Sequence, residues 1–195
     1  MRTTIRTFVA IEIPQSLRAK LNRSLENLRS GLSRNLVRWV RPDSMHLTLN
    51  FLGDIDQLQV GLIQETLDSV VIGRSSFMLE IKGFGSFPNS RRPRVLWVGI
   101  EAAIDDLQQL QSELSHRLEV IGFDAERRDY HPHLTIGRVR KGLSGSETQA
   151  ISDWVQSVQL DSIGRFEVDS ISLKRSVLEP SGAVYTNVYS VRLAQ

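Results

Sequence analysis

Hydrophobic and polar positions along the chain follow two different periods, which predicts a mixture of helices and strands. Apolar side chains recur every three or four positions in four segments, which we expect to be helices: between 14 and 33, 57–71, 102–121 and 147–158. Gly122 follows the third of these at the place where a helix usually ends. Shorter apolar or alternating runs predict strands at 7–13, 37–40, 46–52, 77–87, 94–100, 133–139, 165–177 and 183–193.

The order of these elements favours an α+β fold. Several of the predicted strands are joined by short turns, which is typical of antiparallel sheets. The order strand, helix, strand and helix recurs loosely after residue 94, and no linker or low-complexity segment divides the chain. We therefore expect residues 1–195 to form a single two-lobed domain. Two antiparallel sheets, related by an approximate twofold axis, would flank a central groove and carry the helices on their outer sides.

A histidine-containing tetrapeptide occurs twice, as His46–Leu49 and as His133–Ile136 (His-Leu-Thr-Leu and His-Leu-Thr-Ile). The copies start 87 positions apart (133 − 46), and they contain two of the four histidines of the chain. Side chains at positions i and i+2 of a strand point to the same face. Each copy should therefore present its histidine and threonine on one face. The apolar residues, together with Phe51 after the first copy, should share the other face.

Two such strands facing each other would combine groups that suit phosphate chemistry. Histidine titrates near neutral pH, so His46 and His133 could divide the roles of acid and base. The hydroxyls of Thr48 and Thr135 could donate hydrogen bonds to phosphate oxygens. The reaction that suits this set is in-line attack at phosphorus without a covalent intermediate. One His-x-Thr strand alone is usually structural, but its recurrence with the same apolar pattern makes the structural interpretation the weaker one.

Composition narrows the functional classes further. The chain has 24 Lys and Arg against 22 Asp and Glu, so it is nearly neutral. This charge predicts no broad non-specific binding of nucleic acid, and it is compatible with a local basic patch. The absence of cysteine excludes disulfides and thiol nucleophiles. No metal or nucleotide-loop motif accompanies the histidines, so we expect neither a metal nor another cofactor. No long apolar run is present, so we expect no membrane span and take a cytoplasmic location as the default. We also expect a monomer without an obligate protein partner.

The segments around the two tetrapeptides resemble the two-histidine phosphoesterases. Within this superfamily the chain is most similar to the bacterial RNA 2′,3′-cyclic phosphodiesterases, historically called 2′-5′ RNA ligases. Thr7–Pro14 resembles the opening strand of the family. The first family signature is matched by Val37–Val40 and His46–Gly53, and the second by Pro132–Arg138. The resemblance covers most of the chain.

This resemblance implies hydrolysis of the 2′,3′-cyclic phosphate at an RNA 3′ end, which leaves a 2′-phosphomonoester. It also implies that His46 is the proton donor to the leaving oxygen and that His133 is the proton acceptor from water. The two motifs are alike, so the residues alone leave this order open. The family also joins RNA ends through 2′-5′ linkages, the same chemistry in reverse with a 5′-hydroxyl in place of water.

Arg138 matches an arginine that follows the second signature of the family, and its guanidinium could hold phosphate oxygens. Strand alternation places Arg138 with Leu134 and Ile136 on the apolar side. A bulge or a strand end at Gly137 would turn it toward His133.

Two aromatic residues are further candidates for substrate binding. Phe8 lies on the opposite side of its strand from Val9 and Ile11, where it could stack on a nucleobase or fill the second side of a sheet. Tyr130 precedes the second motif by three residues and could line the groove or simply pack. His131 is expected to be a neighbour of the site and not a catalyst.

Two alternatives to an RNA-end hydrolase remain open. The same site could act on small cyclic nucleotides or on 2′-5′ oligonucleotides. A protein that binds RNA ends without catalysis could reuse the groove, although the intact pair of motifs argues against it.

Overall fold

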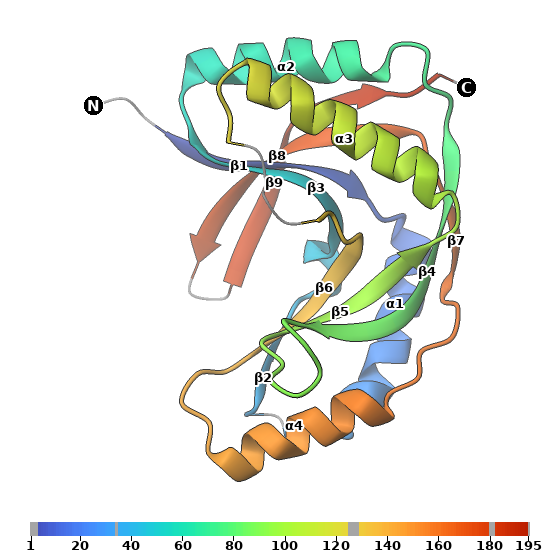
Figure 1. The fold of residues 1–195 in the computed structure, drawn as a ribbon, viewed down its shortest axis with the longest axis vertical. Coiled ribbons are helices and arrows are strands. Elements are labelled where there is room, and N and C mark those ends of the chain that lie inside the picture. Colours follow the sequence, from blue (N-terminus) through green and yellow to red (C-terminus); the bar gives the residue numbers. More distant parts are fainter. Residues whose placement is uncertain (1–3, 34, 125–128, 180–181, 195) are drawn as a thin grey trace.

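The computed structural model describes residues 4–33, 35–124, 129–179 and 182–194, which form one curved sheet with helices packed around it (Figure 1). The strands are β1 (Ile5–Glu12), β2 (Val37–Trp39), β3 (His46–Ile55), β4 (Phe77–Phe87), β5 (Val95–Glu101), β6 (His133–Val139), β7 (Gly164–Val168), β8 (Ser170–Glu179) and β9 (Gly182–Arg192). The helices are α1 (Gln15–Arg29), α2 (Gln57–Val71), α3 (Ile104–Val120) and α4 (Gly145–Ser157), with a 3-10 turn, η1, at Pro42–Ser44.

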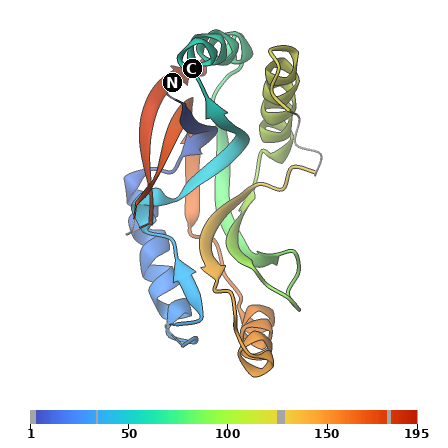
Figure 2. The same ribbon diagram turned by 90° about the vertical axis from the view of Figure 1, so that its left-hand side faces the viewer.

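The predicted α+β class with antiparallel pairing is confirmed, but the prediction of two separate sheets is wrong. The strands form one sheet in the order β7-β4-β5-β6-β3-β1-β8-β9, with β2 also paired to β6. The two halves are joined where β3 pairs with β6, at the single residue pair Leu47 and Leu134. Figure 2 shows these two strands side by side at the centre.

Along the main strand order, each half of the sheet consists of a motif strand and three further strands, and β2 is an additional neighbour of β6. On one side β6 is followed by β5, β4 and β7, and on the other side β3 is followed by β1, β8 and β9. The first strand of the chain therefore lies between β3 and the C-terminal hairpin. The sheet curls so strongly that Ser75, just before β4, forms a bridge with Ala194, just after β9.

The helices agree closely with the periodicity of the sequence. In α1 the buried side chains are Leu17, Leu21 and Leu25, which are spaced by four positions and form one apolar stripe. The Asp56 side chain caps α2 by accepting from two backbone amides of the first turn. Gly122 adopts φ 95°, a left-handed conformation that favours glycine and ends α3 as expected. Within the described ranges, no helix is long and apolar enough to cross a membrane.

The predicted strand at 165–177 is wrong as one element, because the chain changes partners at Asp169. Residues before this position form β7, which pairs with β4, whereas residues after it form β8, which pairs with β1. The carbonyl of Asp169 accepts a hydrogen bond from the Leu193 amide. An apolar pattern does not reveal such a change, because both segments keep strand periodicity.

The pair that joins the two halves can be tested by stability. Leu47 and Leu134 are both 0% exposed, so Leu47→Ala should leave a cavity beneath the junction. We expect it to lower the free energy of unfolding by about 2–5 kcal/mol, measured by urea denaturation. Leu178→Ala is the matched control, because Leu178 is 78% exposed. An equal effect of both substitutions would contradict the importance of the junction.

Candidate active site

The two histidines begin the two central strands, so the strand junction sets their relative position. Leu47 on β3 lies opposite Leu134 on β6. Extending this antiparallel register by one residue in each direction places His46 opposite Thr135, and Thr48 opposite His133. Both leucines point into the core. The four polar side chains therefore gather on the other face, as the strand pattern predicts.

Each imidazole is held by the same local hydrogen bond. The Nδ1 atom of His46 lies 3.0 Å from the carbonyl oxygen of Ser44, and Nδ1 of His133 lies 2.7 Å from the carbonyl oxygen of His131. Because a carbonyl oxygen can only accept, Nδ1 must carry a proton in both rings. Nε2 is then the nitrogen that can give or take a proton.

A β-bulge in the first motif turns Phe51 toward the histidine face. Ala10 pairs with Thr48 and Val9 pairs with Asn50, so Leu49 is an extra residue in β3. Strand alternation is reversed after it, and Phe51 lies opposite Phe8 on the same face as Thr48. The prediction that Phe51 shares the apolar face is therefore wrong. The ring is 71% exposed.

The second motif contains a bulge at the equivalent place. Trp97 pairs with Thr135 and Leu96 pairs with Gly137, so Ile136 is the extra residue in β6. Alternation is again reversed, and Arg138 shares the face of Thr135 instead of that of Leu134. A bulge therefore does turn Arg138, although at Ile136 and not at Gly137, and the role of Arg138 in holding phosphate stays a prediction. After burial, the charge of Arg138 is one of the causes that lower the pKa of His133.

Aromatic side chains enclose His46. The Phe8 ring stacks on the imidazole with a centroid distance of 4.5 Å and an angle of 28°. Tyr185 of β9 meets the same imidazole edge-on at 4.8 Å. Phe8 is only 3% exposed, so its face is occupied by His46 and is not open to a nucleobase. A role of Phe8 in substrate stacking stays a prediction, and the geometry favours a role in holding His46.

A partly buried ion pair lies beside the same histidine. Glu12 pairs with His46 across β1 and β3, and Lys174 of β8 donates a hydrogen bond to Glu12. Although burial acts to raise it, the pKa of Glu12 is lowered by this hydrogen bond and by the Lys174 charge. Burial, with the charge of Lys174, lowers the pKa of His46 to about 4 despite the Ser44 hydrogen bond. His46 is therefore neutral at pH 7 in the free protein.

The surroundings of His133 are different. Phe87 meets its ring edge-on at 4.9 Å, and Trp97 lies 6.4 Å away. Gly99 of β5 lies opposite His133, whereas Glu12 of β1 lies opposite His46 in the other half of the sheet. Burial is the main cause that lowers the pKa of His133. The two histidines are thus alike in motif and orientation but unlike in the charges around them.

Tyr130 connects the two motifs. Its hydroxyl donates a 3.1 Å hydrogen bond to the Thr48 carbonyl, and burial raises the pKa of this phenol, so the proton is retained. The prediction that Tyr130 binds substrate stays a prediction.

Two features of the site escape sequence reasoning. The Glu12–Lys174 pair joins distant strands, and no local pattern announces it. The second is the place of Phe51 on the motif face. Phe51 and Arg138 each stand five positions after a motif histidine (51 − 46 and 138 − 133), and a bulge turns each toward the site, but the sequence suggested such a bulge only for Arg138. A spacing of five positions indicates the face of the histidine only if the intervening bulge is known, because an unbroken strand would put the residue on the opposite face.

A comparison with known families agrees with this duplicated site. The model of the family described as LigT like Phosphoesterase matches the chain twice, at residues 11–97 and 98–185. His46 and His133 each stand 35 positions after the start of their match (46 − 11 and 133 − 98). The chain belongs to the LigT-like phosphoesterase family.

Relatives support the same assignment over nearly the full length, and solved structures share the fold. An RNA 2′,3′-cyclic phosphodiesterase of Methanothermobacter thermautotrophicus is 34% identical, over 97% of this chain and 99% of the relative. One of Thermotoga maritima is also 34% identical, over 95% and 94%. The crystal structure of a Thermus thermophilus protein, TT0787, superposes with a TM-score of 0.79 at 26% identity, covering 97% and 98% of the two chains. E. coli LigT complexed with 3′-AMP shares the fold, with a TM-score of 0.79 at 22% identity, covering 99% and 100%.

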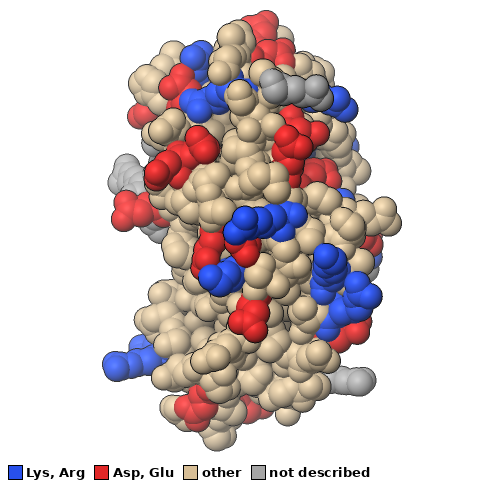
Figure 3. All heavy atoms as spheres, turned by 90° about the vertical axis from the view of Figure 1, so that its right-hand side faces the viewer, with Lys and Arg blue, Asp and Glu red and all other residues tan. Residues whose placement is uncertain are grey.

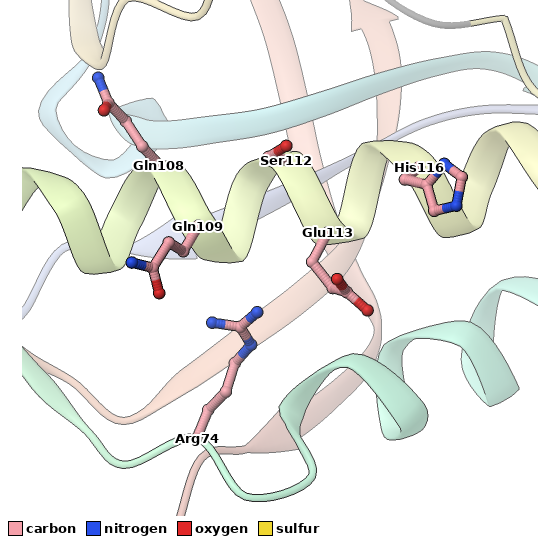
Figure 4. Close-up of a pocket in the computed structure, with 6 residues that line it drawn as sticks. All are labelled: Arg74, Gln108, Gln109, Ser112, Glu113 and His116. Carbon is pink, nitrogen blue, oxygen red and sulfur yellow. The ribbon is translucent and has the colours of Figure 1, made fainter.

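One hollow and one face of this LigT-like phosphoesterase lie apart from the two motif histidines. A hollow of about 620 Å³ beside α3 is lined by polar side chains that include Arg74, Glu113 and His116, and it contains neither motif histidine (Figure 4). On the face opposite to that of Figure 2, basic and acidic side chains are interspersed (Figure 3). In the part of the chain that the structure describes, no three His, Cys, Asp or Glu side chains are grouped to hold a metal ion.

The influence of Lys174 on His46 can be measured directly. Lys174→Met removes a positive charge that opposes protonation of the imidazole, so the pKa of His46 should rise from about 4 toward the ordinary value of 6.5. NMR titration of the histidine rings, with the His46 signal assigned from His46→Asn, gives this value. Lys82→Met is the control, because Lys82 pairs with Glu101 at an exposed position. An unchanged His46 titration in Lys174→Met would contradict the coupling.

Proposed function

We propose that this LigT-like phosphoesterase hydrolyses RNA 2′,3′-cyclic phosphate ends to 2′-phosphomonoesters. The observation that carries the proposal is the pair of imidazoles with equivalent Nδ1 hydrogen bonds, which leaves both Nε2 atoms available on one strand face beside two threonines. Relatives named RNA 2′,3′-cyclic phosphodiesterase, of which this chain covers nearly the full length, support the choice of substrate.

In this mechanism the cyclic phosphate lies over the strand junction. The hydroxyls of Thr48 and Thr135 donate to its non-bridging oxygens, and Arg138 adds a charged donor. Nε2 of His133 takes a proton from the attacking water. His46 delivers a proton from Nε2 to the 3′ oxygen as its bond to phosphorus breaks. After this step His133 holds the proton from water and His46 has lost its own proton. Release of one proton from His133 to solvent and uptake of one by His46 restore both starting states.

Because the pKa of His46 is low in the free protein, His46 can donate a proton only after bound substrate has raised that pKa. A cyclic phosphate diester carries a negative charge, and this charge beside the imidazole favours the protonated ring and raises its pKa. We infer that His46 gains its proton when substrate binds. The Lys174 charge then favours transfer of that proton to the leaving oxygen, because it disfavours the imidazolium.

Phe51 is the residue best placed to receive the terminal nucleobase. Its ring is exposed on the motif face and lies 6.3 Å from Phe8, which in turn supports His46. Aromatic faces stack on any base, so this contact would bind nucleotides without selecting a sequence. The sequence suggested this role for Phe8, whose ring face stacks on His46.

The same site could also run in the joining direction, with the 5′-hydroxyl of a second RNA strand in place of water. Small cyclic nucleotides would use the same catalytic groups but fewer binding contacts. A protein that only binds RNA ends would need no proton transfer at Nε2 of either histidine.

Removal of either imidazole tests the mechanism. His46→Asn and His133→Asn should each lower turnover of a cyclic-ended oligonucleotide by roughly 10²- to 10⁴-fold, because each removes one proton-transfer group. Phosphorus NMR in the presence of a chelator reports the rate, the position of the product phosphate and any need for a metal ion. A 3′-phosphate product, or full activity in either variant, would contradict the proposal.

The same variants decide the order of the roles. With bis(4-nitrophenyl) phosphate the leaving phenolate needs no proton, so the acid becomes dispensable. We expect His46→Asn to keep a larger fraction of the wild-type rate on this substrate than His133→Asn does. The reverse ranking would exchange the two roles and leave the reaction itself unchanged.

Loss of the exposed ring tests base stacking. Phe51→Ala should raise the KM for a cyclic-ended nucleotide roughly tenfold, since it removes one base–aromatic contact, while kcat changes little. Phe51→Tyr keeps the aromatic face and should restore the wild-type KM, whereas Phe51→Leu keeps only apolar area. Steady-state kinetics that show Leu as effective as Tyr would exclude stacking.

A further inference from the structure

Two arginines lie directly opposite each other at one end of the motif face. Arg38 of β2 pairs with Arg138 of β6, and both side chains are exposed. Residues directly opposite in an antiparallel pair point to the same face. Arg38 therefore shares the face that the bulge at Ile136 gives to Arg138, which is also the face of His133 and Thr135.

This pair of arginines has an electrostatic cost. Like charges directly opposite in a sheet repel each other. Among the described residues, no carboxylate forms an ion pair with either guanidinium. A bound anion would convert the repulsion into two attractive contacts.

The Arg38 side chain reaches toward the first histidine's side of the site. A β-carbon built on Gly182 would lie 3.4 Å from Nη2 of Arg38, so the guanidinium lies against the start of β9. The same strand carries Tyr185, whose ring contacts His46. Arg38 therefore lies next to the face that carries the two histidines. It belongs to β2, whereas Arg138 belongs to β6, the strand that also carries His133.

We propose that Arg38 binds a second phosphate of the substrate, the internucleotide phosphate adjacent to the reacting terminal nucleotide. This inference rests on the proposed function, in which Arg138 serves the cyclic phosphate. Neighbouring strands are about 4.8 Å apart, and two long side chains that repel each other spread further. They therefore suit two successive phosphates of one strand better than a single one. The ligand class is a single-stranded RNA end of two or more nucleotides, in preference to a mononucleotide.

The experiment compares two substrates that share the reacting group. Adenosine 2′,3′-cyclic phosphate lacks the second phosphate, whereas a dinucleotide with the same cyclic end has it. Arg38→Met should lower kcat/KM for the dinucleotide roughly tenfold, as expected for one lost charge-assisted contact, and leave the mononucleotide unchanged. Arg38→Lys keeps the charge and should restore much of the preference for the dinucleotide.

Salt dependence provides a second readout that a structural role of Arg38 would not change. Each phosphate contact to single-stranded nucleic acid adds about 0.7 to the slope of log affinity against log salt. The slope of log kcat/KM for the dinucleotide should therefore fall by about 0.7 in Arg38→Met. Arg23→Met is the matched control, because Arg23 is an exposed arginine on α1.

The outcomes separate this inference from the proposed function. Equal losses on both substrates would place Arg38 at the reacting phosphate and overturn the second site. No loss on either substrate, or the same loss in Arg23→Met, would also overturn it. In all of these cases wild-type hydrolysis of the cyclic ends leaves the proposed function standing. Absence of hydrolysis by the wild-type protein would overturn both.

Discussion

The contact between β3 and β6 at one residue pair determines how the polar groups of both motifs are arranged. Leu47 and Leu134 are fully buried, so neither strand can shift without exposing its leucine. A slip of one residue would turn the histidine and threonine of that strand into the core. The register of this apolar pair therefore keeps two imidazoles and two hydroxyls on the same face.

The sequence predicts the helices and the two motifs well because these depend on local periodicity. It does not predict how strands meet. The rule that positions i and i+2 share a face assumes an unbroken pleat, and the bulges at Leu49 and Ile136 break it. Strand alternation alone therefore predicts the wrong face for Phe51. The single sheet and the change of partner at Asp169 likewise depend on contacts between segments distant in the sequence.

Both halves of the sheet carry the same motif, but the residues opposite the motif on the adjacent strands differ between the halves. Opposite His46 is Glu12 with its Lys174 partner, whereas Gly99 occupies the equivalent place beside His133. Opposite Thr48 is Ala10, whereas Trp97 lies opposite Thr135. Two identical imidazoles can therefore differ in proton affinity without any change within the motifs. This is why the assignment of acid and base could not come from the motifs alone.

The Glu12–Lys174 pair joins residues that are 162 positions apart. During synthesis, β1 and the first histidine leave the ribosome long before the strand that completes their surroundings. Until β8 is added, the outer edge of β1 has no partner and Glu12 has no ammonium from Lys174 beside it. The half-sheet around His46 can thus close only when translation is nearly complete. A nascent chain that already displays both His-x-Thr motifs, and Glu12 with them, still lacks the Lys174 charge that lowers the pKa of His46.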